Sequence, residues 1–114
     1  MIDCIFCRIV SGDVSSEKVY EDEEILAFKD INPLAPVHLL VIPKKHLTSL
    51  EEVQPEDQAL LGRILLVIQK LARDHGVHET GYRVVTNIGR DGGQIVHHLH
   101  FHLLGGKPLG NKIG

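Results

Sequence analysis

Near the C-terminus of this chain, residues 98–103 read His-Leu-His-Phe-His-Leu, and this alternation constrains the fold more than any other feature. A β-strand sends successive side chains to opposite faces, so a strand that begins at His98 places His98, His100 and His102 on one face. The three side chains are then spaced roughly 6.5 to 7 Å apart. The leucine and phenylalanine side chains between them take the opposite, buried face. The alternation therefore predicts a strand with three imidazole rings on one surface.

Three imidazole rings on one surface indicate a metal or catalytic site rather than side chains that only fill the core. A single histidine in a strand is most simply explained as a tolerated, half-buried side chain, but an alternating row is not. Imidazole titrates at about pH 6.5, which suits either a metal site or acid–base and nucleophilic work near neutral pH.

A glycine-rich loop at residues 87–94 immediately precedes the histidine run. Its Gly92-Gly93 pair, taken alone, is explained by a simple turn. Beside three imidazoles, the same glycines also allow backbone N–H groups to approach an anion closely. A phosphate bound next to a row of histidines indicates phosphoryl or nucleotidyl transfer.

Apolar periodicity and breaker residues predict an α+β fold. A short helix is expected over residues 4–11, capped by Asp3 and ended by Gly12, and a long helix over residues 55–75, ended by Gly76. Strands outnumber helices without regular alternation, which favours an antiparallel sheet of about five strands over a doubly wound fold. Besides the histidine strand, the expected strands cover residues 19–20, 25–28, 38–42 and 83–86.

The long helix carries a wide apolar stripe. Its core positions are expected to be Leu60, Leu61, Ile64, Leu65, Ile68, Leu71 and Ala72, with Leu66 and Val67 widening the stripe. This is more apolar surface than one sheet face needs, so part of it is available for a subunit interface.

Composition narrows the class of protein. With 114 residues and 43% hydrophobic content, the chain is expected to form one domain, 1–114. The net charge is −3, aromatic residues make up 4%, and no basic run exceeds Lys44-Lys45, so a nucleic-acid polymer is not an expected partner. The N-terminus has no leader pattern, and the longest apolar run, residues 64–68, is too short for a bilayer. These features predict a cytoplasmic protein with a small-molecule partner and no membrane association.

Several motifs together resemble one known family. The His-x-His-x-His-x-x run resembles the signature of the histidine triad (HIT) hydrolases, and residues 27–38, 41–46 and 92–94 resemble the Hint branch of that family. The resemblance covers residues 3 to about 110. It implies a HIT-like fold, a homodimer whose sheets join edge to edge, and hydrolysis of purine nucleoside 5′-phosphoramidates or related AMP and GMP conjugates.

The expected catalytic residues combine strand geometry with this resemblance. His100, the central ring, is expected to attack the α-phosphorus and form a nucleotidyl-histidine while a backbone carbonyl holds its other nitrogen. His102 is expected to contact the phosphate or protonate the leaving group, and His98 to orient the nucleophile. His38 matches a fourth histidine that the family places behind the triad, where it would buffer the proton.

The resemblance also implies a nucleotide site. Asp30 would accept hydrogen bonds from the ribose hydroxyls beside Ile31, although a turn-stabilising role for Asp30 before Pro33 explains it equally well. The purine would lie between Ile5, Phe6, Ile9 and Leu40, and the phosphate would bind Asn87, Gly93, Gln94 and the backbone amide of Ile95.

Two features depart from the family pattern. Many Hint proteins carry serine where this chain has Ile95, so only the backbone is available there to contact the leaving group or phosphate. The tail after Gly106 is short and has no tryptophan, whereas the family uses this tail to help set leaving-group preference. The sequence therefore does not identify which leaving group the protein prefers.

Cys4 and Cys7 form a C-x-x-C pair, which in a cytosolic protein is more often a metal half-site or a redox pair than a disulfide. A structural zinc takes four nitrogen or sulfur ligands. The resemblance to bacterial HIT proteins with the same cysteine pair implies His46 and His98 as the other two. The open alternatives are a redox pair and two buried thiols that pack as small hydrophobic side chains, with His46 in solvent.

Two other functions stay open at this point. One is a dinucleoside polyphosphate hydrolase, and the other is a zinc-stabilised nucleotide-binding protein whose triad binds nucleotide with negligible turnover.

Three histidines are not expected to belong to the catalytic site or to the metal site. His75 and His78 are expected on the surface near the end of the long helix, and His97 is expected on the opposite face of the histidine strand.

Overall fold

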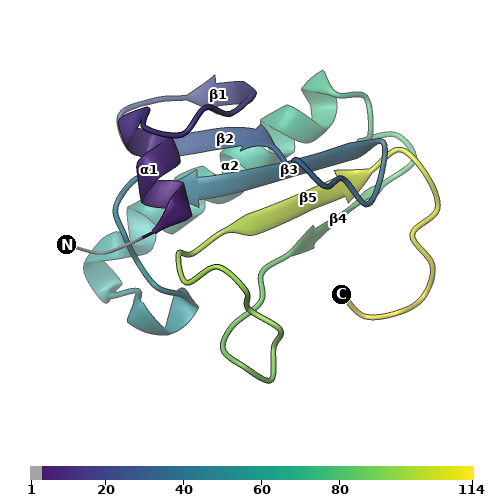
Figure 1. The fold of residues 1–114 in the computed structure, drawn as a ribbon. Helices are drawn as coiled ribbons and strands as arrows, with labels where there is room; N and C mark the ends of the chain where they lie inside the picture. Colours follow the sequence, from purple (N-terminus) through teal and green to yellow (C-terminus); the bar gives the residue numbers. More distant parts are fainter. Residues whose placement is uncertain (1–3) are drawn as a thin grey trace.

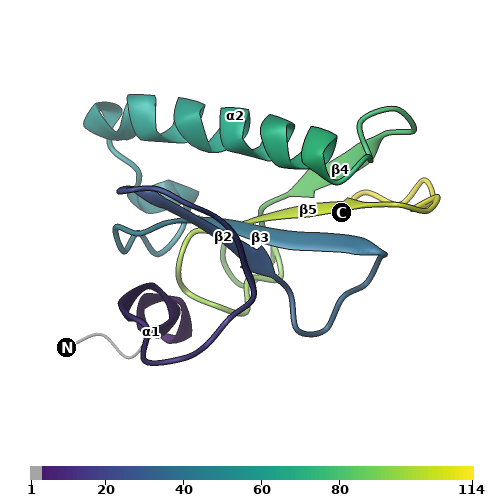
Figure 2. The same ribbon diagram turned by 90° about the horizontal axis from the view of Figure 1, so that it is seen from above.

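Among the described residues, a five-stranded antiparallel sheet separates two α-helices, which confirms the expected α+β fold. The structure is a computed structural model that describes residues 4–114. The strand order is β1-β2-β3-β5-β4, so β3 lies at the centre. Figure 1 shows the sheet face on, and Figure 2 shows α2 on one side of the sheet and α1 on the other. The elements are α1 (Ile5–Ser11), β1 (Lys18–Glu21), β2 (Ile25–Lys29), β3 (Val37–Pro43), α2 (Gln58–Asp74), β4 (Tyr82–Val85) and β5 (Phe101–Gly105), with short 3₁₀ helices at Leu50–Glu52 and Pro55–Asp57.

Helix α1 begins one residue later than expected. Cys4 is its N-cap, and the Cys4 sulfur accepts a hydrogen bond from the Cys7 backbone N–H at 3.4 Å. Gly12 ends the helix at a positive φ of 89° and donates its N–H to the Ile9 carbonyl at 3.2 Å. Asp3, the expected cap, lies outside the described residues.

Helix α2 covers one face of the sheet and buries the larger core. Its buried positions follow the helical period along a single face, and Leu65 and Leu66 are 55% and 65% exposed. The expectation that Leu65 belongs to the core stripe is therefore wrong, because it lies one residue, or about 100°, beyond the contact face at Ile64. The buried α2 residues are Leu60, Ile64, Val67, Ile68, Leu71 and Ala72, which pack with Ile25, Ala27, Leu39, Val41, Val77 and Leu103.

Helix α1 covers only one end of the other face (Figure 1). Its buried side chains join residues from β2 and β3 in a second, smaller core of Cys4, Phe6, Ile9, Leu26, Phe28, Leu40 and Ile42. Because the sheet extends well beyond this short helix, residues of β3 and β5 on the same face remain available to line a pocket.

The histidine strand is shorter than predicted. Strand β5 begins at Phe101, so His98 and His100 precede it, and the prediction of a strand from His98 onward is wrong. The register pairs Val41 with Phe101, so continuing the ladder would bring Pro43 opposite Leu99. Proline has no N–H to offer a ladder, and Leu99 donates its own N–H to the Leu47 carbonyl at 2.6 Å instead.

Within residues 4–114, no helix is long and apolar enough to cross a membrane.

Candidate active site

A pocket of about 600 Å³ lies on the face of the sheet that α1 covers in part. It brings together most of the residues expected to bind a nucleotide, although they come from five separate segments of the chain. The lining consists of Ile5, Phe6, Ile9, Val14, Ser15, Ser16, Phe28, Lys29, Asp30, Ile31, Asn32, Leu34, His38, Leu40, Asn87, Gly93, Ile95, Val96, His100 and His102. Of the expected contacts, Gln94 and His98 do not line this pocket.

His100 is held in one tautomer by the backbone. Its Nδ1 lies 2.7 Å from the carbonyl oxygen of His98. A carbonyl oxygen only accepts hydrogen bonds, so Nδ1 carries the proton and, in the neutral ring, Nε2 carries a lone pair. The Phe6 ring packs edge-on against His100, with ring centres 5.2 Å apart. The nearly buried imidazole therefore presents an unprotonated nitrogen.

A second backbone contact sets the tautomers of His38 and His102. The Leu34 N–H donates to His38 Nδ1 at 3.1 Å, so a neutral His38 carries its proton on Nε2. His38 Nε2 lies 2.9 Å from His102 Nδ1 and donates to it. His102 must then carry its own proton on Nε2. The result is a pair of rings in which the outer one, His102, has an N–H left to donate.

Both of these rings are neutral at pH 7. Burial lowers the pKa of His38, and the nearby Asp30 carboxylate opposes this shift only in part. Burial, followed by the neighbouring His100 and His38 rings, lowers the pKa of His102 to about 4. His102 is thus a hydrogen-bond donor in this pocket rather than a cation.

Asp30, His38 and His102 also lie close enough together to suggest a metal site. The backbone argues against one. The Leu34 N–H occupies His38 Nδ1, so the proton of the neutral ring stays on Nε2, the nitrogen that would have to bind the metal.

Asp30 uses its two carboxylate oxygens differently. Oδ1 accepts the Asn32 N–H at 2.8 Å, which is the turn-stabilising contact that the sequence left open. Oδ2 lies 3.4 Å from His38 Nε2 and belongs to a residue that lines the pocket. The turn therefore engages one oxygen and leaves the other available to a ligand.

Side-chain hydrogen bonds, both within the loop and to Thr48, hold the glycine-rich loop in place. Asn87 Nδ2 donates to the Gly92 carbonyl at 2.8 Å, and a Cβ at Gly92 would clash with the Ile88 carbonyl, so the turn needs glycine there. Gln94 Nε2 donates to the carbonyls of Thr48 and Val96 at 2.6 and 3.0 Å, while its oxygen accepts the Gly89 N–H at 2.9 Å. The expected phosphate contact of the Gln94 side chain is not supported, because this amide holds the loop in place.

The position of the segment before β5 is held by a hydrogen bond from Thr86, a residue that the sequence analysis missed. Thr86 Oγ1 donates to the His100 carbonyl at 2.8 Å, just past the end of β4. Only the register between β4 and β5 brings these two residues together, so no local signal in the sequence identifies Thr86. The link between α1 and β1, with Val14, Ser15 and Ser16, was also missed as part of the pocket wall.

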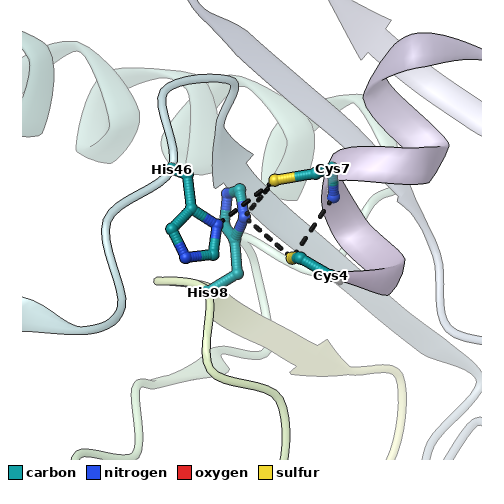
Figure 3. Close-up of side chains that lie close together, drawn as sticks. All are labelled: Cys4, Cys7, His46 and His98. Atoms are coloured by element: carbon teal, nitrogen blue, oxygen red, sulfur yellow. Dashed lines mark hydrogen bonds between the residues drawn. The ribbon is translucent and has the colours of Figure 1, made fainter. Parts of the chain in front are cut away.

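Cys4, Cys7, His46 and His98 form a compact cluster beside this pocket, as expected (Figure 3). Their ligand atoms all lie within 4.8 Å of one another. The His98 Nδ1 is 3.4 Å from Cys4 Sγ and 3.6 Å from Cys7 Sγ, and His46 Nδ1 is 3.2 Å from Cys7 Sγ. Nitrogen and sulfur ligands of a tetrahedral zinc are about 3.5 Å apart, so the donor set fits such an ion.

Two further observations favour a metal at this cluster. His98 Nε2 donates to the Pro43 carbonyl at 2.8 Å, which leaves the Nδ1 lone pair directed at the sulfurs. Burial, followed by the neighbouring Cys4 sulfur, raises the pKa of the Cys7 thiol to about 11. Two thiolates at this place would therefore need a cation beside them.

His98 belongs to both sites. Its side chain is completely buried. The prediction that its ring shares an open surface with the other two imidazole rings is therefore wrong. Its ring faces Cys4 and Cys7, while its carbonyl holds His100.

The remaining histidines belong to neither site. His78 and His97 are exposed, and His75 is half-buried at the end of α2, where its Nδ1 donates to the Leu71 carbonyl at 2.9 Å.

The chain is similar to known proteins over nearly its whole length. Residues 3–113 match the family model described as "Scavenger mRNA decapping enzyme C-term binding". An uncharacterized HIT-like protein of Chlamydia muridarum is 54% identical over 94% of this chain and 84% of its own. The purine nucleoside phosphoramidase of Escherichia coli is 44% identical over 97% of this chain and 93% of its own. A solved structure, a HIT family hydrolase from Clostridium thermocellum, superposes with a TM-score of 0.95 at 46% identity and covers 99% of this chain and 98% of that one.

The lowered pKa of His102 predicts that the free energy of unfolding depends on pH. In the unfolded chain this ring titrates at about 6.5, whereas the fold lowers its pKa to about 4, so between these values the unfolded state binds more protons. The free energy of unfolding should therefore fall as the pH drops from about 7 to about 5. Urea unfolding of the wild type and of His102→Gln should show a shallower decline in the variant. His78→Gln, at an exposed position, is the control, and parallel curves for wild type and His102→Gln would contradict this account.

Proposed function

Because this chain belongs to the histidine triad (HIT) family of hydrolases and acts on nucleotides, we propose that it hydrolyses purine nucleoside 5′-phosphoramidates or related AMP and GMP conjugates. The observation that carries this proposal is the hydrogen bond from His100 Nδ1 to the His98 carbonyl, which leaves Nε2 of a pocket-lining ring unprotonated. The similarity to the phosphoramidase of Escherichia coli supports the choice of substrate class.

His100 is the proposed nucleophile. Its Nε2 forms a bond to the α-phosphorus while the bond from phosphorus to the leaving nitrogen or oxygen breaks, and the leaving group takes a proton from solvent. Water then attacks the nucleotidyl-histidine, the N–P bond breaks, and the nucleoside monophosphate leaves as the proton of water returns to solvent. Throughout, the His98 carbonyl holds the Nδ1 proton, so it can stabilise the positive charge that forms on the ring.

His102 is proposed to bind the phosphate. Of its two expected roles, donating a hydrogen bond to a phosphate oxygen suits a neutral ring with its proton on Nε2, whereas protonating the leaving group would produce an imidazolate. His38 then acts as the residue that fixes the His102 tautomer. His98 contributes through its carbonyl rather than through its buried ring.

The nucleotide is proposed to span the whole pocket. Asp30 Oδ2 would accept a hydrogen bond from the ribose beside Ile31, and the backbone amide of Ile95 would bind the phosphate with Asn87, beside Gly93. The Gly93 N–H itself donates to the Arg90 carbonyl at 3.1 Å within the loop. The purine would pack between the apolar side chains of Ile5, Phe6, Ile9 and Leu40, which line the same pocket.

We also propose that Cys4, Cys7, His46 and His98 hold a structural zinc ion. Two thiolates and two imidazoles make a closed donor set, which is typical of structural rather than catalytic zinc. When bound, the ion would tie the N-cap of α1 to the loop after β3 and to the segment before β5. These residues would thereby fix the position of His98, and with it the carbonyl that holds His100.

A single domain that forms a homodimer is proposed for the assembly. Both cores share one sheet, which supports one domain over residues 1–114. Leu65 and Leu66 of α2 are exposed, and Tyr82 and Val84 of the edge strand β4 are 38% and 40% exposed. Apolar side chains on a helix and an unpaired strand edge are the surfaces that a second copy would cover.

Replacing the nucleophile tests the proposed reaction. His100→Ala should lower kcat for an adenosine phosphoramidate by at least about a thousandfold but keep AMP binding, since the ring makes the covalent bond while affinity is spread over base, ribose and phosphate. The exposed neighbour His97→Ala is the matched control. Wild type quenched during turnover should carry a nucleotidyl adduct on His100 by mass spectrometry.

The same assay separates the alternatives. Faster release of AMP from a diadenosine polyphosphate than from the phosphoramidate would favour a dinucleoside polyphosphate hydrolase. Binding without turnover of either substrate would favour a nucleotide-binding protein. Near-native kcat in His100→Ala, or an adduct on another residue, would refute the assignment of the nucleophile.

Metal analysis tests the zinc proposal. Protein purified without chelator should contain about one zinc per chain. The variant Cys4→Ser/Cys7→Ser should lose the metal and melt at a lower temperature, because a closed metal site is linked to folding. His97→Ala should keep both. Metal-free protein from zinc-supplemented medium, or a double variant as stable as the wild type, would contradict the proposal.

A further inference from the structure

Two neighbouring residues just past the end of β4 hold two different parts of the candidate active site. Thr86 Oγ1 donates a hydrogen bond to the His100 carbonyl at 2.8 Å, and Asn87 Nδ2 donates to the Gly92 carbonyl at 2.8 Å. The first contact holds the segment that carries the proposed nucleophile, and the second lies within the glycine-rich loop. Since β4 is the neighbour of β5 in the sheet, one strand end anchors both parts (Figure 1).

His100 lies beyond the regular pairing of the two strands. The ladder between β4 and β5 ends where Val85 lies opposite His102, and β5 itself begins at Phe101. Backbone groups outside a ladder need other hydrogen-bond partners to fix their position. The Thr86 hydroxyl supplies one for the His100 carbonyl from the side of β4.

The two hydrogen bonds of His100 have different consequences. The bond from its Nδ1 to the His98 carbonyl determines which ring nitrogen carries the proton. The bond from Thr86 acts on the main-chain carbonyl of His100, so it affects where the ring stands relative to a phosphate bound beside Asn87. In-line attack needs the reacting atoms roughly 3 to 3.5 Å apart and aligned, and a displacement of about 1 Å slows such a step by about a hundredfold.

We propose that Thr86 is a positioning residue of the proposed reaction, whose hydroxyl holds the His100 backbone so that Nε2 is aligned with the α-phosphorus. This inference rests on the proposed function, because it assumes that His100 attacks a phosphate bound beside Asn87. Thr86 is half-buried and does not itself line the pocket, so it acts through His100 rather than on the substrate. Its loss should therefore reduce kcat while substrate binding is kept.

Steady-state kinetics and calorimetry test this separation. Thr86→Val keeps the branched shape but lacks the hydroxyl, Thr86→Ser keeps the hydroxyl, and Thr80→Val makes the same change at an exposed threonine. With an adenosine phosphoramidate, Thr86→Val should lower kcat roughly ten- to a hundredfold and leave the Kd of AMP unchanged. Thr86→Ser should recover most of the lost kcat, and Thr80→Val should match the wild type. If Thr86→Val does not fold, Thr86→Ala takes its place.

Two further readouts distinguish positioning from a purely structural role. Thr86→Val should melt at a lower temperature, because the His100 carbonyl loses its partner, so kcat is measured well below that temperature. Normal kcat in the folded variant, or equal losses in Thr86→Val and Thr86→Ser, would overturn the inference. Nitrogen-15 NMR of Thr86→Val should still show the His100 proton on Nδ1. A proton moved to Nε2 would trace the loss to the tautomer and would also overturn it.

The wild type and His100→Ala separate failure of this inference from failure of the proposed function. If the wild type does not release AMP from the phosphoramidate, or if His100→Ala still does, the proposed reaction is wrong and the role of Thr86 falls with it. If the wild type is active, His100→Ala is inactive and Thr86→Val has the kcat of the wild type, the proposed function stands and only the role of Thr86 is wrong.

Discussion

The hydrogen bond from His100 Nδ1 to the His98 carbonyl is the contact on which the rest of this site depends. It is made in a segment outside the regular sheet, so other contacts must hold the backbone there. Pro43 accepts from the His98 ring, Leu47 accepts the Leu99 N–H, and Thr86 donates to the His100 carbonyl. Leaving the ladder costs the chain regular hydrogen bonds, and these three contacts hold the segment that carries His98 and His100 instead.

A single physical pattern links the two sites. In each of His38, His98 and His100, a backbone group engages one ring nitrogen and thereby determines what the other nitrogen offers. A carbonyl partner leaves a lone pair, as at His98 and His100, and an amide partner leaves an N–H, as at His38. Burial lowers the pKa of His38, His98 and His102, so these rings stay neutral and the pattern persists at physiological pH.

Local patterns in the sequence were enough to predict the α+β class, the central strand and the long helix, because periodicity and breaker residues act over a few neighbours. The cysteine pair was visible, whereas its partners His46 and His98 came from resemblance and are confirmed as neighbours by the cluster. The start of β5 could not be predicted, because it depends on Pro43 across the sheet. Thr86 was missed for the same reason: its role arises from a hydrogen bond to His100, a residue distant in sequence.

The central claim is that the backbone holds His100 in the tautomer that leaves Nε2 free. Nitrogen-15 NMR of histidine-labelled protein at neutral pH reads this directly, because protonated and unprotonated ring nitrogens resonate far apart, and a His100→Gln variant identifies the signals. The account predicts a protonated Nδ1 and an unprotonated Nε2 for His100. A neutral ring with its proton on Nε2 would contradict it, since the nitrogen proposed to attack phosphorus would then have no lone pair.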